Sequence, residues 1–175
     1  MIKNIYYLTF SFLFFTFQIS FQKKYYLISL INLIASYMYF LLIKNPSIKI
    51  RYIDWILTTP LLLYELSTIL DIKDKNIQII IQISNLLMFS FGWFGEKYLK
   101  YRNLFCFLGF IPLFIIFSIL YKYVINPIHK FYYNYFLILW SFYGIIYLKK
   151  NNRGIYYNFL DILSKSIFSL IYMYR

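Results

Sequence analysis

Long apolar runs separated by short polar stretches dominate the chain. A membrane-spanning helix needs about 17–25 apolar residues, and seven runs approach or reach that length. They are Ile5–Phe21, Tyr25–Ile43, Arg51–Leu70, Ile77–Phe94, Leu104–Tyr121, Phe131–Leu148 and Ile155–Tyr174. Connections of roughly three to ten residues force neighbouring helices to run antiparallel and leave no room for a soluble domain. The pattern predicts an all-α fold, a seven-transmembrane-helix bundle with very short loops that forms a single domain over residues 1–175.

The composition agrees with a lipid-facing surface. Hydrophobic residues make up 62% of the chain and charged residues 14%, whereas about a quarter of a soluble domain is charged. The net charge of +12 comes from Lys and Arg clusters that lie between the apolar runs. No basic face or recognition motif accompanies them, so we do not expect nucleic-acid binding. Cys106 is the only cysteine, and neither a disulfide nor a metal site is predicted.

The loop charges do not orient the chain in the membrane. With the N-terminus outside, the cytoplasmic segments hold seven basic residues and the extracellular segments nine, leaving out Arg51 and Lys165. The positive-inside rule therefore does not favour this orientation.

Four charged residues fall inside the apolar runs. Lys165 lies near the middle of the seventh run and Asp161 one turn before it, while Asp54 and Glu65 belong to the third. The other acids, Asp71, Asp74 and Glu96, are expected in loops. Charges buried in lipid are costly and usually functional. A structural ion pair between Lys165 and Asp161 is the simpler alternative, but the third run favours a functional interpretation.

The third and seventh runs cross the membrane in the same direction, which places Arg51, Asp54 and Asp161 on one side of Lys165. Glu65 lies beyond Lys165 on the other side, about 10 Å past Thr58. Two cations and two carboxylates make the first cluster neutral, as a buried cluster should be. Desolvation favours a protonated Glu65 at rest. A vectorial proton pump requires an ionised proton acceptor on one side of a group that can change its protonation state, and a protonated donor on the other side.

Two segments carry a family resemblance. Arg51-Tyr52-Ile53-Asp54-Trp55-Ile56-Leu57-Thr58-Thr59-Pro60-Leu61-Leu62-Leu63 resembles the third helix of microbial rhodopsins. Leu160-Asp161-Ile162-Leu163-Ser164-Lys165 resembles their seventh helix, whose lysine forms a Schiff base with all-trans retinal. Trp140-Ser141-Phe142-Tyr143 is similar to the aromatic wall of the sixth helix, and Tyr39 matches a second-helix tyrosine near the counterion.

The resemblance implies a role for each matched residue. Asp54 would be the primary proton acceptor, hydrogen-bonded by Thr58, and Asp161 the second counterion. Arg51 would tune both carboxylates and gate proton release, and Glu65 would return a proton to the Schiff base. The residues expected to bind retinal together with Lys165 are Trp55, Thr59, Leu62, Met88, Gly92, Trp140, Tyr143 and Tyr147.

The same resemblance implies a light-driven ion transporter rather than an enzyme, with protons and the lipid bilayer as its partners. It implies a multi-pass integral membrane protein with an extracellular N-terminus that assembles as a homo-oligomer, a trimer or a pentamer.

Some positions depart from the family pattern. Gly144 stands where the sixth helix usually has a proline, which puts the kink of that helix in doubt. Arg153, and no acid, lies in the last predicted extracellular connection, so a paired-acid release group is not expected. His129, the only histidine, is expected to be a solvated loop residue.

A light-driven outward proton pump is the leading interpretation, because Asp54, Thr58 and Glu65 occur together. A light-gated cation channel is the main alternative, although the second run contains no acid. A photosensor ranks third, because sensors usually lack a carboxylate at the position of Glu65.

Overall fold

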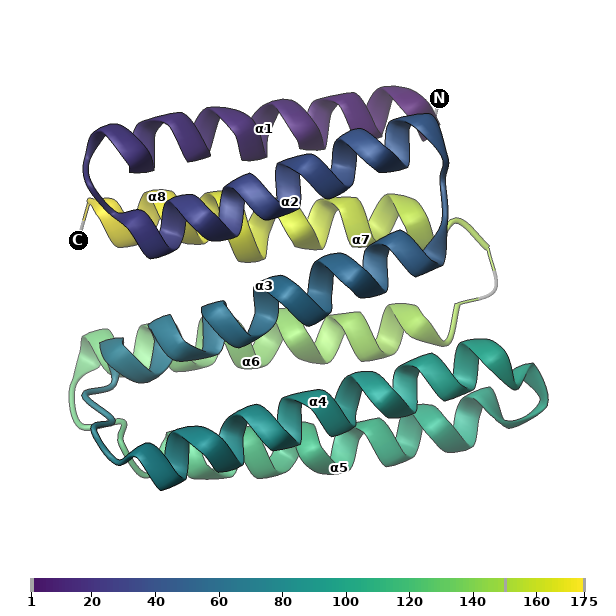
Figure 1. Cartoon of the computed structure of the whole chain (residues 1–175). Helices are drawn as coiled ribbons and strands as arrows, with labels where there is room; N and C mark the ends of the chain where they lie inside the picture. The colour runs from purple at the N-terminus through teal and green to yellow at the C-terminus, as the bar shows by residue number, and fades with distance from the viewer. Residues whose placement is uncertain (1, 150, 175) are drawn as a thin grey trace. The chain divides into compact units, whose positions relative to one another are not determined.

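The computed structural model describes residues 2–149 and 151–174 (Figure 1), and residues 1, 150 and 175 lie outside the description. The described residues form seven successive helical segments joined by short connections. The first six are α1 (Ile2–Gln22), α2 (Tyr26–Lys44), α3 (Ile48–Ile69), α4 (Lys75–Lys97), α5 (Arg102–Tyr121) and α6 (Pro127–Tyr147). A short 3₁₀ turn, η1 (Leu99–Tyr101), precedes α5. The seventh is continuous through α7 (Arg153–Asp161), the π-helical turn η2 (Ile162–Ile167) and α8 (Phe168–Met173).

Each predicted span coincides with one helical segment, and the boundaries differ by no more than four residues. The all-α prediction with seven helices is therefore confirmed. Three described segments are long and apolar enough to cross a membrane by length and composition alone, namely Tyr26–Lys44, Lys75–Lys97 and Leu99–Tyr121.

The outward-facing side chains are strongly apolar. Phe15 on α1, Ile83 on α4 and Phe107 on α5 are 57%, 53% and 69% exposed. Exposed apolar surface on this scale exceeds what a soluble monomer presents. It fits helices that are surrounded by lipid.

The helices form two compact units, and the boundary falls inside α3 between Thr58 and Thr59. The first unit contains α1, α2, the beginning of α3 and the seventh segment, and α1 packs against α2, α7 and η2. Its apolar core includes Leu13, Ala35 and Leu42. In the second unit, which spans residues 59–149, α4 packs against α5, and α5 packs against α6.

Local side-chain chemistry sets the helix ends. The Asp74 carboxylate accepts hydrogen bonds from the backbone N–H groups of Asn76 and Ile77 at 2.8 and 3.4 Å, which caps the start of α4. Asn126 caps α6 in the same way, with Pro127 as its first residue.

The cap at Asn126 overturns the prediction for His129, which is not a solvated loop residue. His129 lies in the first turn of α6 and is only 5% exposed. Its Nδ1 is 3.0 Å from the Tyr123 carbonyl oxygen, and its Nε2 is 3.9 Å from the Asp71 carboxylate. Because Pro127 and Asn126 start the helix before the apolar run does, hydropathy alone placed His129 outside it.

The loop prediction for Glu96 is also wrong. Glu96 lies in the last turn of α4, and its carboxylate accepts a hydrogen bond from the Arg102 guanidinium at 2.8 Å. Its side chain is 9% exposed. Pairing with Arg102 extends α4 by about a turn past the apolar run.

Candidate functional site

Lys165 is a buried cation held between two buried carboxylates of the first unit. Its side chain is 1% exposed and lies in η2. The Nζ atom donates a hydrogen bond to Asp54 Oδ2 at 2.7 Å and is 3.7 Å from Asp161 Oδ1. Because an isolated charge in this environment would be strongly unfavourable, the two acids are what allow an ionised amine at this depth.

The helix changes its hydrogen-bond pattern at Lys165. The Phe168 N–H reaches back to the Leu163 carbonyl, five residues earlier, as in a π-helical turn. Such turns are rare and occur often at functional sites. No residue type in the surrounding sequence signals this one, so the turn was not predicted.

Two polar residues fix the backbone of this turn and were also missed. The Ser169 hydroxyl donates to the Lys165 carbonyl oxygen at 2.5 Å, and Asn32 Nδ2 donates to Ser169 Oγ at 2.7 Å. Asn32 is fully buried on α2, and an asparagine in the middle of an apolar run was the available signal.

Asp161 is held by several donors. The Tyr39 hydroxyl donates to Oδ2 at 2.6 Å, and the Trp55 indole N–H donates to Oδ1 at 3.1 Å. The Arg51 Nη1 atom lies 3.6 Å from Oδ2. Hydrogen bonds of this kind stabilise the charged form of a carboxylate.

Arg51 joins α3 to α2 and α7. Its guanidinium donates to the Tyr39 hydroxyl at 3.1 Å, to the Gly154 carbonyl oxygen at 3.2 Å and to Asn158 Oδ1. Asn158 is fully buried and was missed by the sequence reasoning. It lies one turn before Asp161 on the same face of α7, which is the spacing that would have identified it.

Asp54 has fewer donors than Asp161. The Thr58 hydroxyl donates to the main-chain carbonyl oxygen of Asp54 at 2.8 Å and lies 3.5 Å from the carboxylate. The predicted contact between Thr58 and Asp54 is therefore made mainly to the backbone. Lys165 and Arg51 together balance Asp54 and Asp161, so the cluster is neutral.

The remaining predicted site residues belong to the second unit. Glu65 and Leu62 on α3 are buried, at 5% and 1% exposure. Thr59 and Asn85 exchange hydrogen bonds at 3.4 and 3.1 Å, which links α3 to α4.

Trp140 and Tyr147 on α6 contact α5 and α4, respectively, within this unit. The Trp140 ring stands almost perpendicular to those of Phe117 and Phe136, with centroids 6.1 Å apart in both pairs. The Tyr147 hydroxyl donates to the Gly92 carbonyl oxygen at 2.9 Å. Two residues expected to bind retinal, Tyr147 and Gly92, are thus in direct contact.

The sequence singled out three further positions in the second unit, on α4 and α6. Met88 and Tyr143 are partly buried. The Phe110 ring occupies the position that a side chain at Gly144 would take, 2.4 Å from an ideal Cβ. The glycine that replaces the usual proline therefore permits close packing between α6 and α5.

Comparisons with known proteins identify the family of the chain and similar solved structures. The family model described as bacteriorhodopsin-like protein matches residues 3–175. A search of curated proteins returns no match. Among solved structures, viral rhodopsin OLPVRII superposes with a TM-score of 0.90 at 26% identity, covering 98% of this chain and 95% of its own.

Two further structures support the fold. The light-driven proton pump Coccomyxa subellipsoidea rhodopsin has a TM-score of 0.88 at 21% identity, covering 98% of this chain and 95% of its own. Acetabularia rhodopsin I has a TM-score of 0.87 at 20% identity, covering 98% of this chain and 92% of its own. The chain therefore belongs to the bacteriorhodopsin-like family of microbial rhodopsins, integral membrane proteins with a seven-helix fold that bind retinal.

Proposed function

We propose that this protein is a light-driven outward proton pump that carries all-trans retinal on Lys165. The observation that carries the proposal is the 2.7 Å contact between Lys165 Nζ and a buried Asp54 carboxylate that has few other donors. A proton that leaves the lysine nitrogen has an acceptor already in hydrogen-bond contact.

The residues around Lys165 fit a retinal linkage. Retinal bound to the Nζ atom would supply a protonated, light-switchable imine that carries the same single positive charge as the lysine ammonium. The carboxylates of Asp54 and Asp161 already balance such a charge in a buried environment. The neutral cluster therefore needs no rearrangement of charge to accept the cofactor.

Asp54 is the better proton acceptor of the two carboxylates. Asp161 is stabilised as an anion by the Tyr39 hydroxyl, the Trp55 indole and the Arg51 guanidinium. Asp54 loses its main charged partner when the lysine nitrogen gives up its proton. The proton therefore moves to Asp54, while Arg51 and Asp161 remain an ion pair.

Glu65 is proposed as the donor that restores the proton. It lies eleven residues after Asp54 on α3 and is 5% exposed, a separation of about 16 Å along a helix. A buried carboxyl group favours its neutral form, so Glu65 stays protonated until it donates its proton to the deprotonated Lys165 nitrogen. With the N-terminus outside, Glu65 is on the cytoplasmic side and transport is outward.

We also propose that residues 1–175 act as one retinal-binding domain. Lys165 and its counterions belong to the first unit, whereas Trp140, Tyr143 and Tyr147 belong to the second. The family model, which matches residues 3–175 without a break, supports this proposal.

The test is light-induced transport in cells that express the protein and are supplied with retinal. A pump acidifies the external medium on illumination, and a protonophore abolishes the change. A light-gated channel instead passes a current that reverses with the applied voltage, and a sensor produces neither signal. Either of the last two results would reject the pump.

A further inference from the structure

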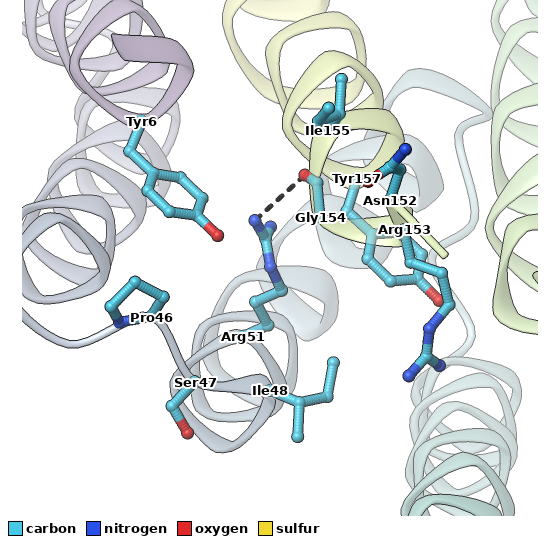
Figure 2. A pocket seen from close by; sticks show the side chains of 10 residues that line it. All are labelled: Tyr6, Pro46, Ser47, Ile48, Arg51, Asn152, Arg153, Gly154, Ile155 and Tyr157. Carbon is cyan, nitrogen blue, oxygen red and sulfur yellow. Dashed lines mark hydrogen bonds between the residues drawn. The ribbon is translucent and has the colours of Figure 1, made fainter. Parts of the chain in front are cut away.

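A cavity of about 290 Å³ lies beside Arg51 in the first unit (Figure 2). Its walls come from α1, from the connection between α2 and α3, and from the first residues of α3 and α7. Pro46 and Asn152 on its wall are exposed, so the cavity reaches the protein surface. It is large enough for several waters or for a small ion with part of its hydration shell.

The charged groups on the wall are both cationic. Arg51 and Arg153 are among the ten described lining residues, and none of those ten is Asp or Glu. A guanidinium keeps its charge at any physiological pH. The cavity therefore attracts anions and repels cations.

Arg51 lines the cavity and retains donor capacity. A guanidinium has five N–H donors, and Arg51 makes hydrogen bonds to Tyr39, Gly154 and Asn158. These three bonds leave N–H groups for a ligand.

The Tyr6 hydroxyl provides a second, independent indication. Tyr6 is 5% exposed and makes no hydrogen bond through its hydroxyl to any residue in the described part of the chain. Figure 2 shows this hydroxyl directed toward the Arg51 guanidinium. Two donors that face one space match the requirements of an anion.

The start of α7 adds to the same field. Its first residues, from Arg153 on, line the cavity, and Asn152 before them has a left-handed backbone (φ 58°) and no capping side-chain hydrogen bond. A helix N-terminus carries partial positive charge and binds anions. Helix, guanidinium and phenol all favour negative charge at this place.

We propose that this cavity binds a small monovalent anion, such as chloride, with part of its hydration shell. Arg51 already shares its charge with Asp161 at 3.6 Å, so the site suits one negative charge rather than two. The proposal does not depend on proton transport, because the donors belong to the folded protein itself.

The test is thermal unfolding of the purified, retinal-supplied protein at constant ionic strength, with sodium gluconate replaced stepwise by sodium chloride. Gluconate is bulkier and strongly hydrated, and we expect it to bind more weakly. Saturable binding at ten times Kd should raise the unfolding midpoint by about 3–6 °C. Tyr6→Phe removes the unpartnered hydroxyl and should raise the chloride concentration for half-maximal stabilisation about tenfold or more.

Tyr7→Phe is the matched control, because Tyr7 neighbours Tyr6 on α1 but is 55% exposed and does not line the cavity. It should behave as the unmodified protein. An unfolding midpoint that is the same in chloride and gluconate would mean that the cavity holds only water. A chloride effect that is unchanged in Tyr6→Phe would mean that the anion binds elsewhere. Either result overturns the proposal.

Discussion

The unequal hydrogen bonding of Asp54 and Asp161 predicts which carboxylate receives the proton. Tyr39 and Trp55 donate to Asp161 at 2.6 and 3.1 Å, whereas the Thr58 hydroxyl is 3.5 Å from the Asp54 carboxylate. A hydrogen bond to a charged group contributes about 1.5–3 kcal/mol, so the two donors stabilise ionised Asp161 by about 3–6 kcal/mol. Since about 1.4 kcal/mol is a factor of ten, almost every transferred proton should be found on Asp54.

The perturbation that tests this is the double variant Tyr39→Phe with Trp55→Phe. It removes both hydrogen-bond donors from Asp161 and keeps an aromatic ring at each position. The advantage of about 3–6 kcal/mol is then lost, while Arg51 still favours an ionised Asp161. We expect the transferred proton to divide between the two carboxylates. Tyr37→Phe is the control, because Tyr37 lies on the same helix and is 56% exposed.

Light-minus-dark infrared difference spectra provide the assay, because a newly protonated carboxyl group gives a distinct C=O band. In the unmodified protein we expect one such band, absent in Asp54→Asn and present in Asp161→Asn. In the double variant a second band should appear, and Asp161→Asn should remove it. The reasoning is refuted if the band of the unmodified protein survives Asp54→Asn and disappears in Asp161→Asn.

Three other substitutions and one control have definite expected outcomes. Lys165→Ala should give a colourless protein with retinal supplied, and visible absorption in that variant would exclude Lys165 as the anchor. Glu65→Gln cannot donate a proton and should slow recovery of the photocycle at neutral pH, so an unchanged flash-photolysis recovery would contradict the donor role. Gly95→Ala places a Cβ 2.0 Å from the Tyr147 hydroxyl and should cost about 1–3 kcal/mol of stability. Gly109→Ala is the control, because its Cβ would have no neighbour closer than 3.7 Å, and it should leave the unfolding midpoint nearly unchanged. Equal losses of thermal stability in the two variants would reject the steric argument.

The helices were predictable because the apolar runs are long and the breaks between them are strong. Runs such as Leu104–Tyr121 and Tyr25–Ile43 coincide closely with α5 and α2. The errors lie at helix ends, because capping residues, and not hydropathy, determine where a helix begins or ends. Asn126 and Pro127 start α6 before its apolar run and bury His129.

The charged members of the site were predictable because an ionised group in an apolar run is conspicuous. Asp161 and Lys165 are four residues apart on one helix, and their proximity follows from helix geometry. Asn158 and Ser169 were missed because polar, uncharged residues are common in membrane helices. The π-helical turn at Lys165 depends on tertiary packing, for which the local sequence has no marker.

Charge balance in the cluster also predicts when the transported proton leaves. Transfer of a proton from the Lys165 nitrogen to Asp54 neutralises both groups and leaves Arg51 paired with Asp161 at 3.6 Å. The cluster therefore stays neutral, and its charge does not favour release of a proton. Return of a proton from Glu65 makes the nitrogen positive again and gives the cluster a net charge of +1, which favours loss of the proton from Asp54.

Release should therefore follow reprotonation of the Lys165 nitrogen. A pH-sensitive dye in the external medium should report acidification during the final recovery of the pigment after a flash. Acidification that coincides instead with formation of the deprotonated state would require a separate release group. Because Arg153 and the cavity beside Arg51 present positive charge at that end of α7, a group that stores a proton there is unfavourable, and late release is the expected order.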